Sequence, residues 1–462
     1  MPAIRTWQLA TGAATVGLAL AAGAVAAAGP WESGQRLAER EWAAAQRPEG
    51  TDQRVPGRKR PAPAPSAPAV LAGLGAAPAT APADAKPAGP GAGLAKLIKD
   101  PGLGPLRTAS VVEVATGRTL YAREAGKAMP PASTIKIATA VAALTALGPD
   151  HRIPTTVVAA GRRITLVGGG DASLDRAALR ALADRTARAL RARGADSVRL
   201  AYDTSLHRGN PLHPIGMNGN LAPVVALMVD EGREDPDSTG YGARSDDPAG
   251  DAARLFAKLL GERGVQITAS PAPGRPAPGS RPLAVVRSAP LSALVERMLT
   301  DSDNDLAEAL ARQTARASGE EMSFAGAGRA VREQLARLKM PLAGSRFADG
   351  SGLNRKDRVS AGLLTALLTR AASPDHPGLR PVLTGLPVAG FSGTLRDRYP
   401  GSSPGAGLVR AKTGTLTGVN SLSGTVVASD GRLLAFAFLA GDTPSRDAAQ
   451  SALDRLAASL VS

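Results

Sequence analysis

The chain has 462 residues, with 55 Lys or Arg against 40 Asp or Glu and a net charge of +15 at pH 7. This length exceeds one ordinary hydrophobic core, so two or three domains are expected. The absence of cysteine excludes disulfides, thiolate zinc sites and a lipidated cysteine anchor. Lys and Arg are scattered, without a basic block interleaved with aromatic residues, so we expect a solvated basic surface and no nucleic-acid partner.

The four histidines give no pattern of metal ligands. They are separated in the chain, and two of them lie in a Gly/Pro/Asn-rich stretch rather than at helical ligand spacing: His151, His207, His213 and His376. No Gly-x-Ser-x-Gly elbow accompanies any of them. The sequence therefore predicts no metal site and gives no support to a Ser-His-Asp triad.

The amino-terminal part predicts export. An uncharged run from Trp7 to Pro30 ends in small residues, as a signal peptide does, and is also long enough to span a bilayer if uncut. Residues 1–31 are thus expected to be a signal peptide or signal anchor, and 32–93 a short polar helix followed by a Pro/Ala-rich linker. That linker cannot bury enough surface to order itself and is predicted to be a disordered tether, which slightly favours an uncleaved anchor.

The first motif is a Ser-x-x-Lys formed by Ser133 and Lys136, at the head of an apolar helical stretch through Leu144. Residues three positions apart share one face of a helix, so the amine reaches the hydroxyl as a base reaches a nucleophile. Pro130-Pro131 fixes the helix entry and places Ser133 in the first turn, near backbone N–H groups that favour negative charge.

Alternating patterns surround this motif. A hairpin is predicted from strands 109–114 and 119–122, with Thr116-Gly117 between them. Residues 150–288 are expected to be an inserted region, with strands at 155–158, 164–167 and 197–202 and helices at 174–193 and 250–264. The run Gly168-Gly169-Gly170-Asp171 lacks the spacing of a phosphate loop and predicts a turn in which Asp171 or Ser173 caps helix 174–193.

The second and third motifs follow the insertion. Ser302 and Asn304 lie on a predicted turn between helices, where positions i and i+2 of extended backbone project together. Lys412-Thr413-Gly414-Thr415 lies on a predicted strand of an antiparallel meander that continues to Leu439 and is followed by a terminal helix, 446–460. Gly414 allows another backbone to approach closely, as an oxyanion or a substrate strand needs.

Ser-x-x-Lys, Ser-x-Asn and Lys-Thr-Gly in this order are the signature of the penicillin-recognising serine enzymes. The chain most closely resembles the class C low-molecular-mass penicillin-binding proteins, the D-alanyl-D-alanine carboxypeptidase/endopeptidases. The long insertion, the glycine motif 166–171 and the segment from Asp349 to Arg355 resemble that class, although Asn354 replaces its usual serine. We assign that segment no chemistry.

The resemblance implies an α/β (α+β) β-lactamase-like transpeptidase fold, with an antiparallel five-stranded sheet flanked by helices. Residues 94–149 and 289–462 would form the discontinuous catalytic domain, and 150–288 one or two small inserted domains. The expected partners are peptidoglycan peptides ending in D-Ala-D-Ala and β-lactam antibiotics, with the membrane reached through an uncleaved amino-terminal segment. The protein would be extracytoplasmic, anchored to the membrane or secreted to the cell wall.

The resemblance also implies a mechanism without metal or organic cofactor. Ser133 attacks the carbonyl between two D-alanines, and Lys136 takes its proton after burial and the charge of Lys412 have lowered its pKa. Ser302 relays the proton to the leaving amine, and Asn304 holds Lys136 or the substrate amide. Lys412 and Thr413 bind the terminal carboxylate, while the N–H groups of Ser133 and Thr415, beside Gly414, form the oxyanion hole.

Two other functions stay open at this point. A β-lactamase of the same fold would need fast deacylation, but the stretch from Glu333 to Ala336 lacks the Glu-x-x-Leu-Asn pattern of class A enzymes. A non-catalytic wall-binding protein would suit the basic charge and the tether. All candidate catalytic residues are nevertheless present, so the sequence favours the peptidase.

Overall fold

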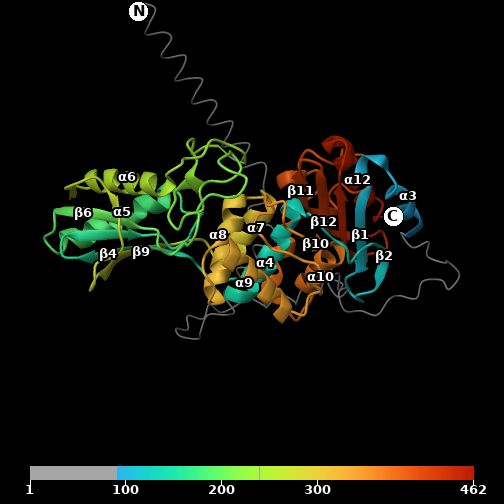
Figure 1. Ribbon diagram of the computed structural model, residues 1–462, viewed down its shortest axis with the longest axis horizontal. Helices are drawn as coiled ribbons and strands as arrows, with labels where there is room; N and C mark the ends of the chain where they lie inside the picture. The colour runs from blue at the N-terminus through green and yellow to red at the C-terminus, as the bar shows by residue number, and fades with distance from the viewer. Residues whose placement is uncertain (1–90, 239, 462) are drawn as a thin grey trace, which may run out of the picture. The chain divides into compact units, whose positions relative to one another are not determined.

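The computed structural model describes residues 91–238 and 240–461, which belong to one unit of the chain, 86–462 (Figure 1). Its first sheet joins strands from both ends of this unit, in the order β11-β12-β13-β1-β2, with every neighbouring pair antiparallel. The strands are β1 (Leu106–Glu113), β2 (Thr119–Arg123), β11 (Val409–Leu416), β12 (Val419–Val427) and β13 (Leu433–Gly441). The predicted antiparallel five-stranded sheet, its hairpin and its carboxy-terminal meander are confirmed.

Helices cover both faces of this sheet because its inner strands are apolar on both sides. In β13, Ala435, Ala437 and Leu439 pack into one hydrophobic core and Phe436 and Phe438 into another, as alternation along a strand requires. The second core contains α12 (Arg446–Ala458) and Leu94 of α3 (Gly91–Leu97). The first is built with α4 (Lys136–Leu147), α7 (Leu291–Thr300), α8 (Asn304–Ala317), α9 (Phe324–Arg337), α10 (Ala361–Ala372) and α11 (Pro381–Thr384).

Helix α4 lies at the centre of the helical layer, and every residue from Lys136 to Leu144 is buried. Alanine dominates this stretch, so neighbouring helices can pack closely on every side. A helix that is apolar all round is stable only in such a position. Lys136 of the first motif is therefore held inside the molecule.

Residues 154–287 form a second sheet with a core of its own, in the order β7-β6-β5-β4-β9, with β8 also paired to β6. Its elements are β4 (Pro154–Ala160), β5 (Arg163–Val167), α5 (Arg176–Arg191), β6 (Ser197–Asp203), α6 (Pro248–Gly261), β7 (Gln266–Ile267), β8 (Ala272–Pro273) and β9 (Arg281–Arg287). Strand β5 runs antiparallel to β4 and parallel to β6. The division of the chain into domains stays a prediction, which this separate core supports.

The predicted turn after β5 is present, but the predicted cap of the next helix is wrong. Helix α5 begins at Arg176, and its cap is Asp175, whose carboxylate accepts from the Ala178 N–H at 2.7 Å. Asp171 instead accepts from the Ser173 amide at 2.9 Å. A Cβ at Gly169 would lie 1.8 Å from the Pro154 carbonyl oxygen, so the run is small because backbones cross there.

Short elements complete the described chain. They are η2 (Pro101–Leu103), β3 (Ala128–Met129) paired with β10 (Val359–Ser360), η3 (Ala132–Ile135), η4 (Asp230–Gly232), η5 (Pro377–Leu379) and η6 (Gly393–Leu395). Helix α3 begins within the last three residues of the predicted linker. The predicted signal segment, the polar helix and the rest of the linker lie outside the described residues. Within the described part, none of the helices combines the length and the hydropathy needed to cross a bilayer.

Candidate active site

The nucleophile motif sits on a 3-10 turn rather than on the α-helix itself. Ser133 belongs to η3, and α4 begins at Lys136. In a 3-10 turn residues i and i+3 eclipse, and Lys136 Nζ accordingly lies 3.0 Å from Ser133 Oγ. Ala132 directly before the serine has a φ of 47°, a strained conformation for alanine.

Strands β11 and β12 pack against this turn. Ser421 Oγ of β12 donates to the Pro131 carbonyl at 2.6 Å, as does Thr134 Oγ1 at 2.8 Å. A Cβ on Gly414 of β11 would lie 2.6 Å from the Pro131 oxygen and 3.1 Å from the Ser133 nitrogen. The close approach predicted for Gly414 is therefore present, and the backbone that approaches is the turn carrying Ser133.

Lys136 is fully buried and surrounded by three acceptors. Its Nζ lies 3.0 Å from Ser133 Oγ, 2.7 Å from Asn304 Oδ1 and 2.7 Å from the Ser351 carbonyl oxygen. Burial lowers its pKa to about 8, against the opposing charges of Asp349, Asp303, Glu308 and Asp305. A neutral amine donates twice and keeps one lone pair. If Asn304 and Ser351 take the two donors, that lone pair faces the serine hydroxyl.

The second motif lies between two helices, as predicted, but its geometry differs. Asn304 is the first residue of α8, and Asp303 is its cap, accepting from the Leu306 N–H at 2.9 Å. Ser302 has a left-handed φ of 59°. The expected extended i, i+2 arrangement is wrong: a strained residue followed by a helix start places these side chains. Asn304 Nδ2 donates to the Asn220 carbonyl at 2.9 Å.

The third motif runs along β11, the edge strand of the sheet. Lys412 is 0% exposed, and its Nζ donates to the Thr413 carbonyl at 2.9 Å. Burial lowers its pKa far below the usual value, and the charge of Lys136 lowers it further. Burial is the largest cause of the lowered pKa of Lys136, and the repulsion between the two ammonium groups, which is mutual, disfavours the state in which both lysines are charged.

The outer edge of β11 presents main-chain donors. Ala411 N–H points to that edge and donates to the Pro387 carbonyl at 2.9 Å. Since alternate residues of an antiparallel strand turn their N–H groups to the same side, those of Thr413 and Thr415 point outward as well. The hydroxyl of Thr413 meets Thr394 of η6 at 2.9 Å. The structure thus joins Ser133, Lys136 and Asn304 by hydrogen bonds and places Gly414 against the turn that carries Ser133. Lys412, Thr413 and Thr415 lie on the same strand as Gly414.

The sequence interpretation missed the loop from Asp349 to Asn354. Its Ser351 carbonyl accepts from Lys136, and Thr139 Oγ1 donates to the Gly350 carbonyl at 2.7 Å. Both loop amides, of Gly350 and Ser351, donate to Glu308 Oε1 at 3.0 Å. The sequence of this segment resembles that of the family, but a main-chain carbonyl can belong to any residue type and so has no sequence signature. The sequence does contain one indication of a buried polar partner for such a loop, which is Glu308, one turn after Asn304 on the apolar face of α8.

Buried carboxylates around this loop have partners. Glu308 pairs with Arg312 at 3.0 Å, and Asp349 forms a hydrogen bond of 2.9 Å with the His213 ring. Burial and the charge of Asp349 raise the pKa of Asp357 to about 10, so this carboxyl is protonated at neutral pH.

In the described part of the chain, two clusters of three side chains have the spacing of a cation site. The first cluster is His213, Glu308 and Asp349, and the second is Glu231, Asp303 and Asp305. In the first cluster, backbone amides and Arg312 already occupy the carboxylate oxygens. In the second, Arg233, Arg244 and Arg297 pair with the three carboxylates. These donor sets fit ion pairing rather than a metal ion.

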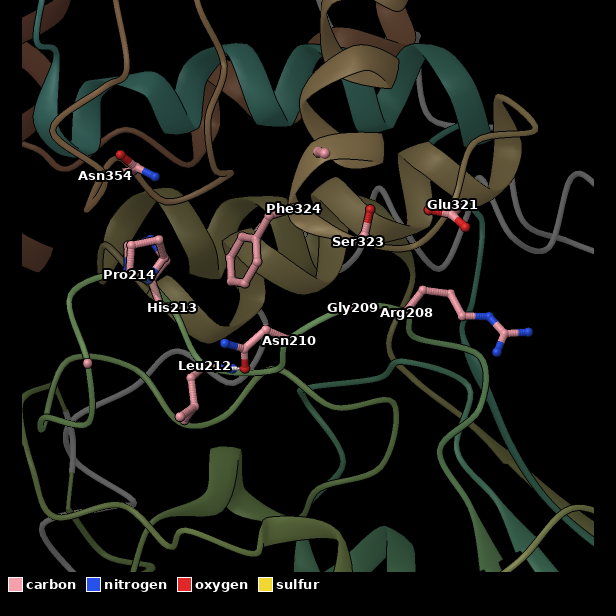
Figure 2. Close-up of a pocket in the computed structure, with 12 residues that line it drawn as sticks. Arg208, Gly209, Asn210, Leu212, His213, Pro214, Glu321, Ser323, Phe324 and Asn354 are labelled. Atoms are coloured by element: carbon pink, nitrogen blue, oxygen red, sulfur yellow. Dashed lines mark hydrogen bonds between the residues drawn. The ribbon is translucent and has the colours of Figure 1, made fainter.

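A pocket of about 640 Å³ lies beside this loop (Figure 2). Figure 2 shows the rings of His213 and Phe324 side by side at its wall, with Asn354 at one end and Arg208 and Glu321 at the other. Its remaining lining residues are Gly209, Asn210, Leu212, Pro214, Gly216, Ser323 and Ala325. Asn354 is three residues from Ser351, so the pocket neighbours the lysine site without containing the three motifs.

Comparisons with known proteins find a matching family profile and several similar chains. The profile of the D-Ala-D-Ala carboxypeptidase 3 (S13) family matches residues 91–243 and 234–460. A carboxypeptidase of Mycobacterium tuberculosis is 38% identical over 426 residues, covering 87% of this chain and 90% of that protein. A D-alanyl-D-alanine carboxypeptidase of Actinomadura sp. is 30% identical over 429 residues, covering 73% and 78%. Penicillin binding protein 4 of Haemophilus influenzae shares the fold, with a TM-score of 0.68, 20% identity and coverage of 80% and 99%.

Proposed function

Because the chain belongs to the D-Ala-D-Ala carboxypeptidase 3 (S13) family and is a serine DD-peptidase, we propose that Ser133 is its nucleophile and Lys136 the general base. The observation that carries this assignment is the 3.0 Å separation of Lys136 Nζ and Ser133 Oγ at a fully buried amine. In its neutral form Lys136 accepts the serine proton as Oγ bonds to the carbonyl carbon between two D-alanines.

The tetrahedral intermediate then collapses by breaking the C–N bond. Its oxyanion accepts from the N–H groups of Ser133 and Thr415, of which the second points out from the edge of β11. Ser302 passes the proton from Lys136 to the leaving amine, while Asn304 holds Lys136 in place through the 2.7 Å hydrogen bond. Water hydrolyses the acyl-enzyme. When the leaving amine belongs to a cross-link, the same steps give endopeptidase action.

Lys412 and Thr413 bind the carboxylate of the terminal D-alanine. Two ammonium groups cannot both be charged cheaply in this buried site, and the pKa of Lys412 is lowered accordingly. A substrate carboxylate supplies the opposite charge that restores the ammonium form of Lys412. Peptides that end in a free carboxylate are thereby favoured over internal peptide bonds. Gly414 keeps the strand close to the Ser133 turn.

A β-lactam is the probe for the acyl-enzyme, because its strained amide presents the same carbonyl to Ser133. We expect benzylpenicillin to add covalently to the intact protein and peptide mapping to place the adduct on Ser133. The adduct should persist, and Ser133→Ala should give none. Rapid loss of the adduct with hydrolysed drug would indicate a β-lactamase. No adduct on the folded wild-type chain would indicate a binding protein.

Acylation should depend on pH through Lys136. Only the neutral amine acts as base, and its pKa is about 8, so below pH 8 the neutral fraction rises about tenfold per pH unit. We expect the second-order acylation rate to rise with the same slope and to level off above pH 8. Stopped-flow measurements with a chromogenic cephalosporin check this. A rate independent of pH between 6 and 9 would contradict the role of Lys136.

Replacing Ser302 by glycine should lower the acylation rate without lowering the stability of the fold, because Ser302 has a strained backbone. Ser302→Gly removes the relay hydroxyl, so we expect acylation to fall by about 10²-fold or more. The left-handed φ of 59° suits glycine, so the thermal midpoint should not fall. Lys339→Gly is the matched control, since Lys339 has a comparable φ of 57° outside the three motifs, and the activity of this variant should be unchanged. Full activity of Ser302→Gly would exclude the relay.

The substrate class places the catalytic part outside the cytoplasm, and we infer that residues 1–31 export it and hold it at the membrane. The uncharged run from Trp7 to Pro30 and the linker behind it support this arrangement. Fractionation of cells that make the full chain tests it. The anchor is expected to keep the protein with membranes until detergent is added, and recovery of a shortened chain in the medium would show cleavage.

A further inference from the structure

We propose that the segment 212–222, which lies between β6 and α6, positions both acceptors that hold Lys136, and that His213 is a positioning residue for the acylation step. This inference rests on the proposed role of Lys136. The two acceptors are the Ser351 carbonyl and Asn304 Oδ1. The first is connected to the segment through His213, Asp349 and the loop amides, and the second by one hydrogen bond to the Asn220 carbonyl.

The first connection runs through His213 and Asp349, which are 4% and 2% exposed. His213 Nδ1 accepts from the Ile215 N–H at 3.2 Å, so Nε2 carries the proton and donates to Asp349 Oδ2 at 2.9 Å. Asp349 in turn accepts from the Gly352 N–H at 2.6 Å and the Asn354 N–H at 2.7 Å. These bonds enclose Ser351 on both sides and fix the direction of its carbonyl.

The second connection runs through main chain. Asn304 Nδ2 donates to the Asn220 carbonyl at 2.9 Å, which leaves Oδ1 of the same amide for Lys136. A flipped amide would present Nδ2 to the amine and leave two donors facing each other. The Ala222 N–H also donates to Asp305 Oδ1 at 3.1 Å. The segment is therefore attached to the first turn of α8 as well as to the 349–354 loop.

Packing explains why the segment can transmit position. Leu221 and Val224 form one cluster with Leu353 of the loop, against which Leu416 at the end of β11 packs. The His213 ring also meets the edge of Phe324 on α9, 5.3 Å between centroids. The segment 212–222 is thus linked to the 349–354 loop, to α8 and, through the apolar cluster, to β11. A movement of this segment therefore shifts the acceptors of Lys136.

The charged groups around His213 and Asp349 come from every neighbouring element. Glu308 and Arg312 lie on α8, Asp357 follows the loop and Lys136 lies on α4. Asp357 is protonated near neutral pH, while Glu308 is paired with Arg312. A carbonyl acceptor favours the charged form of an amine. If the Ser351 carbonyl moves away, the pKa of Lys136 falls.

The test compares glutamine and asparagine at position 213, because their side-chain amides end at different distances from the backbone. The terminal nitrogen of glutamine occupies the place of His Nε2, so His213→Gln keeps the donor to Asp349; the nitrogen of asparagine stops near Nδ1, so His213→Asn loses it. We expect His213→Asn to lower the acylation plateau by about 10- to 100-fold and to move the midpoint of the pH profile below 8. His213→Gln should regain most of the wild-type rate and midpoint.

His207→Asn is the matched control, because His207 is a half-buried histidine just upstream whose Nδ1 faces the Val224 carbonyl at 3.3 Å and not the loop. Its plateau and midpoint should match the wild type. Thermal midpoints are measured for all three variants. An unchanged plateau and midpoint in His213→Asn would overturn the inference, as would equal losses in His207→Asn. Failure of the wild-type chain to acylate at Ser133 would instead overturn the proposed function.

Discussion

Lys136→Met is expected to reduce the rate of Ser133 acylation by about 10³-fold at pH 8, within the range that general-base catalysis contributes. Methionine fills the volume of the buried side chain but has no lone pair of sufficient basicity for the serine proton. The measurement is the second-order rate of acylation by benzylpenicillin, followed by mass spectrometry. Its dependence on pH between 6 and 9 should disappear, since the titrating amine is gone.

The control for this variant is Lys127→Met, which removes an exposed lysine paired with Glu124. Its acylation rate and pH profile should equal those of the wild type. Circular dichroism verifies that Lys136→Met is folded, because the change leaves Asn304 Oδ1 and the Ser351 carbonyl without their donor. A folded Lys136→Met protein with acylation within tenfold of the wild type would exclude Lys136 as the base.

Gly414→Ala is expected to lower acylation by about 10²-fold or more although it adds only one methyl group. The new Cβ would lie 2.6 Å from the Pro131 carbonyl oxygen and 3.1 Å from the Ser133 nitrogen, so β11 and the serine turn must separate. A displacement of about 1 Å is enough for a loss of this size. Overpacking should also lower the unfolding free energy by about 1–3 kcal/mol.

Gly126→Ala controls for the general effect of replacing a glycine, since a Cβ there meets nothing within 4 Å. It should leave the acylation rate and the thermal midpoint unchanged. Acylation by Gly414→Ala at the wild-type rate would show that the contact between β11 and the serine turn is not needed. The comparison separates the oxyanion hole from the base, because the pH midpoint of Gly414→Ala should stay near 8.

The strands and helices around the motifs could be predicted because each is encoded by a local period. Alternation of apolar residues predicts β11, β12 and β13, and the helical period predicts the terminal helix α12 with its observed first residue, Arg446. The three motifs were found for the same reason, since Ser133 and Lys136 are three residues apart and Ser302 and Asn304 two. Their assembly into one site follows from the fold that such a trio accompanies.

Local signals failed where a backbone crossing or a strained residue decides the geometry. Asp171 looked like a helix cap, but the glycines before it lie against Pro154 and Ala226, and the helix starts later, after Asp175. The side chain of Ser302 is placed by a left-handed backbone, a conformation that serine seldom adopts and that sequence patterns do not indicate.

By itself, the sequence determined the chemistry available to this protein: a serine, two lysines and an amide in the order that a serine peptidase needs. The tertiary structure decided what lowers the pKa of Lys136 and which groups hold its amine in place. The Ser351 carbonyl accepts from Lys136 directly, across a separation of 215 residues. Glu308 and the Asn220 carbonyl act through one partner each, and His213 acts through Asp349 and the 349–354 loop. Burial of the amine, and with it a pKa near 8, results from that long-range packing, because desolvation belongs to the folded surroundings and not to the residue.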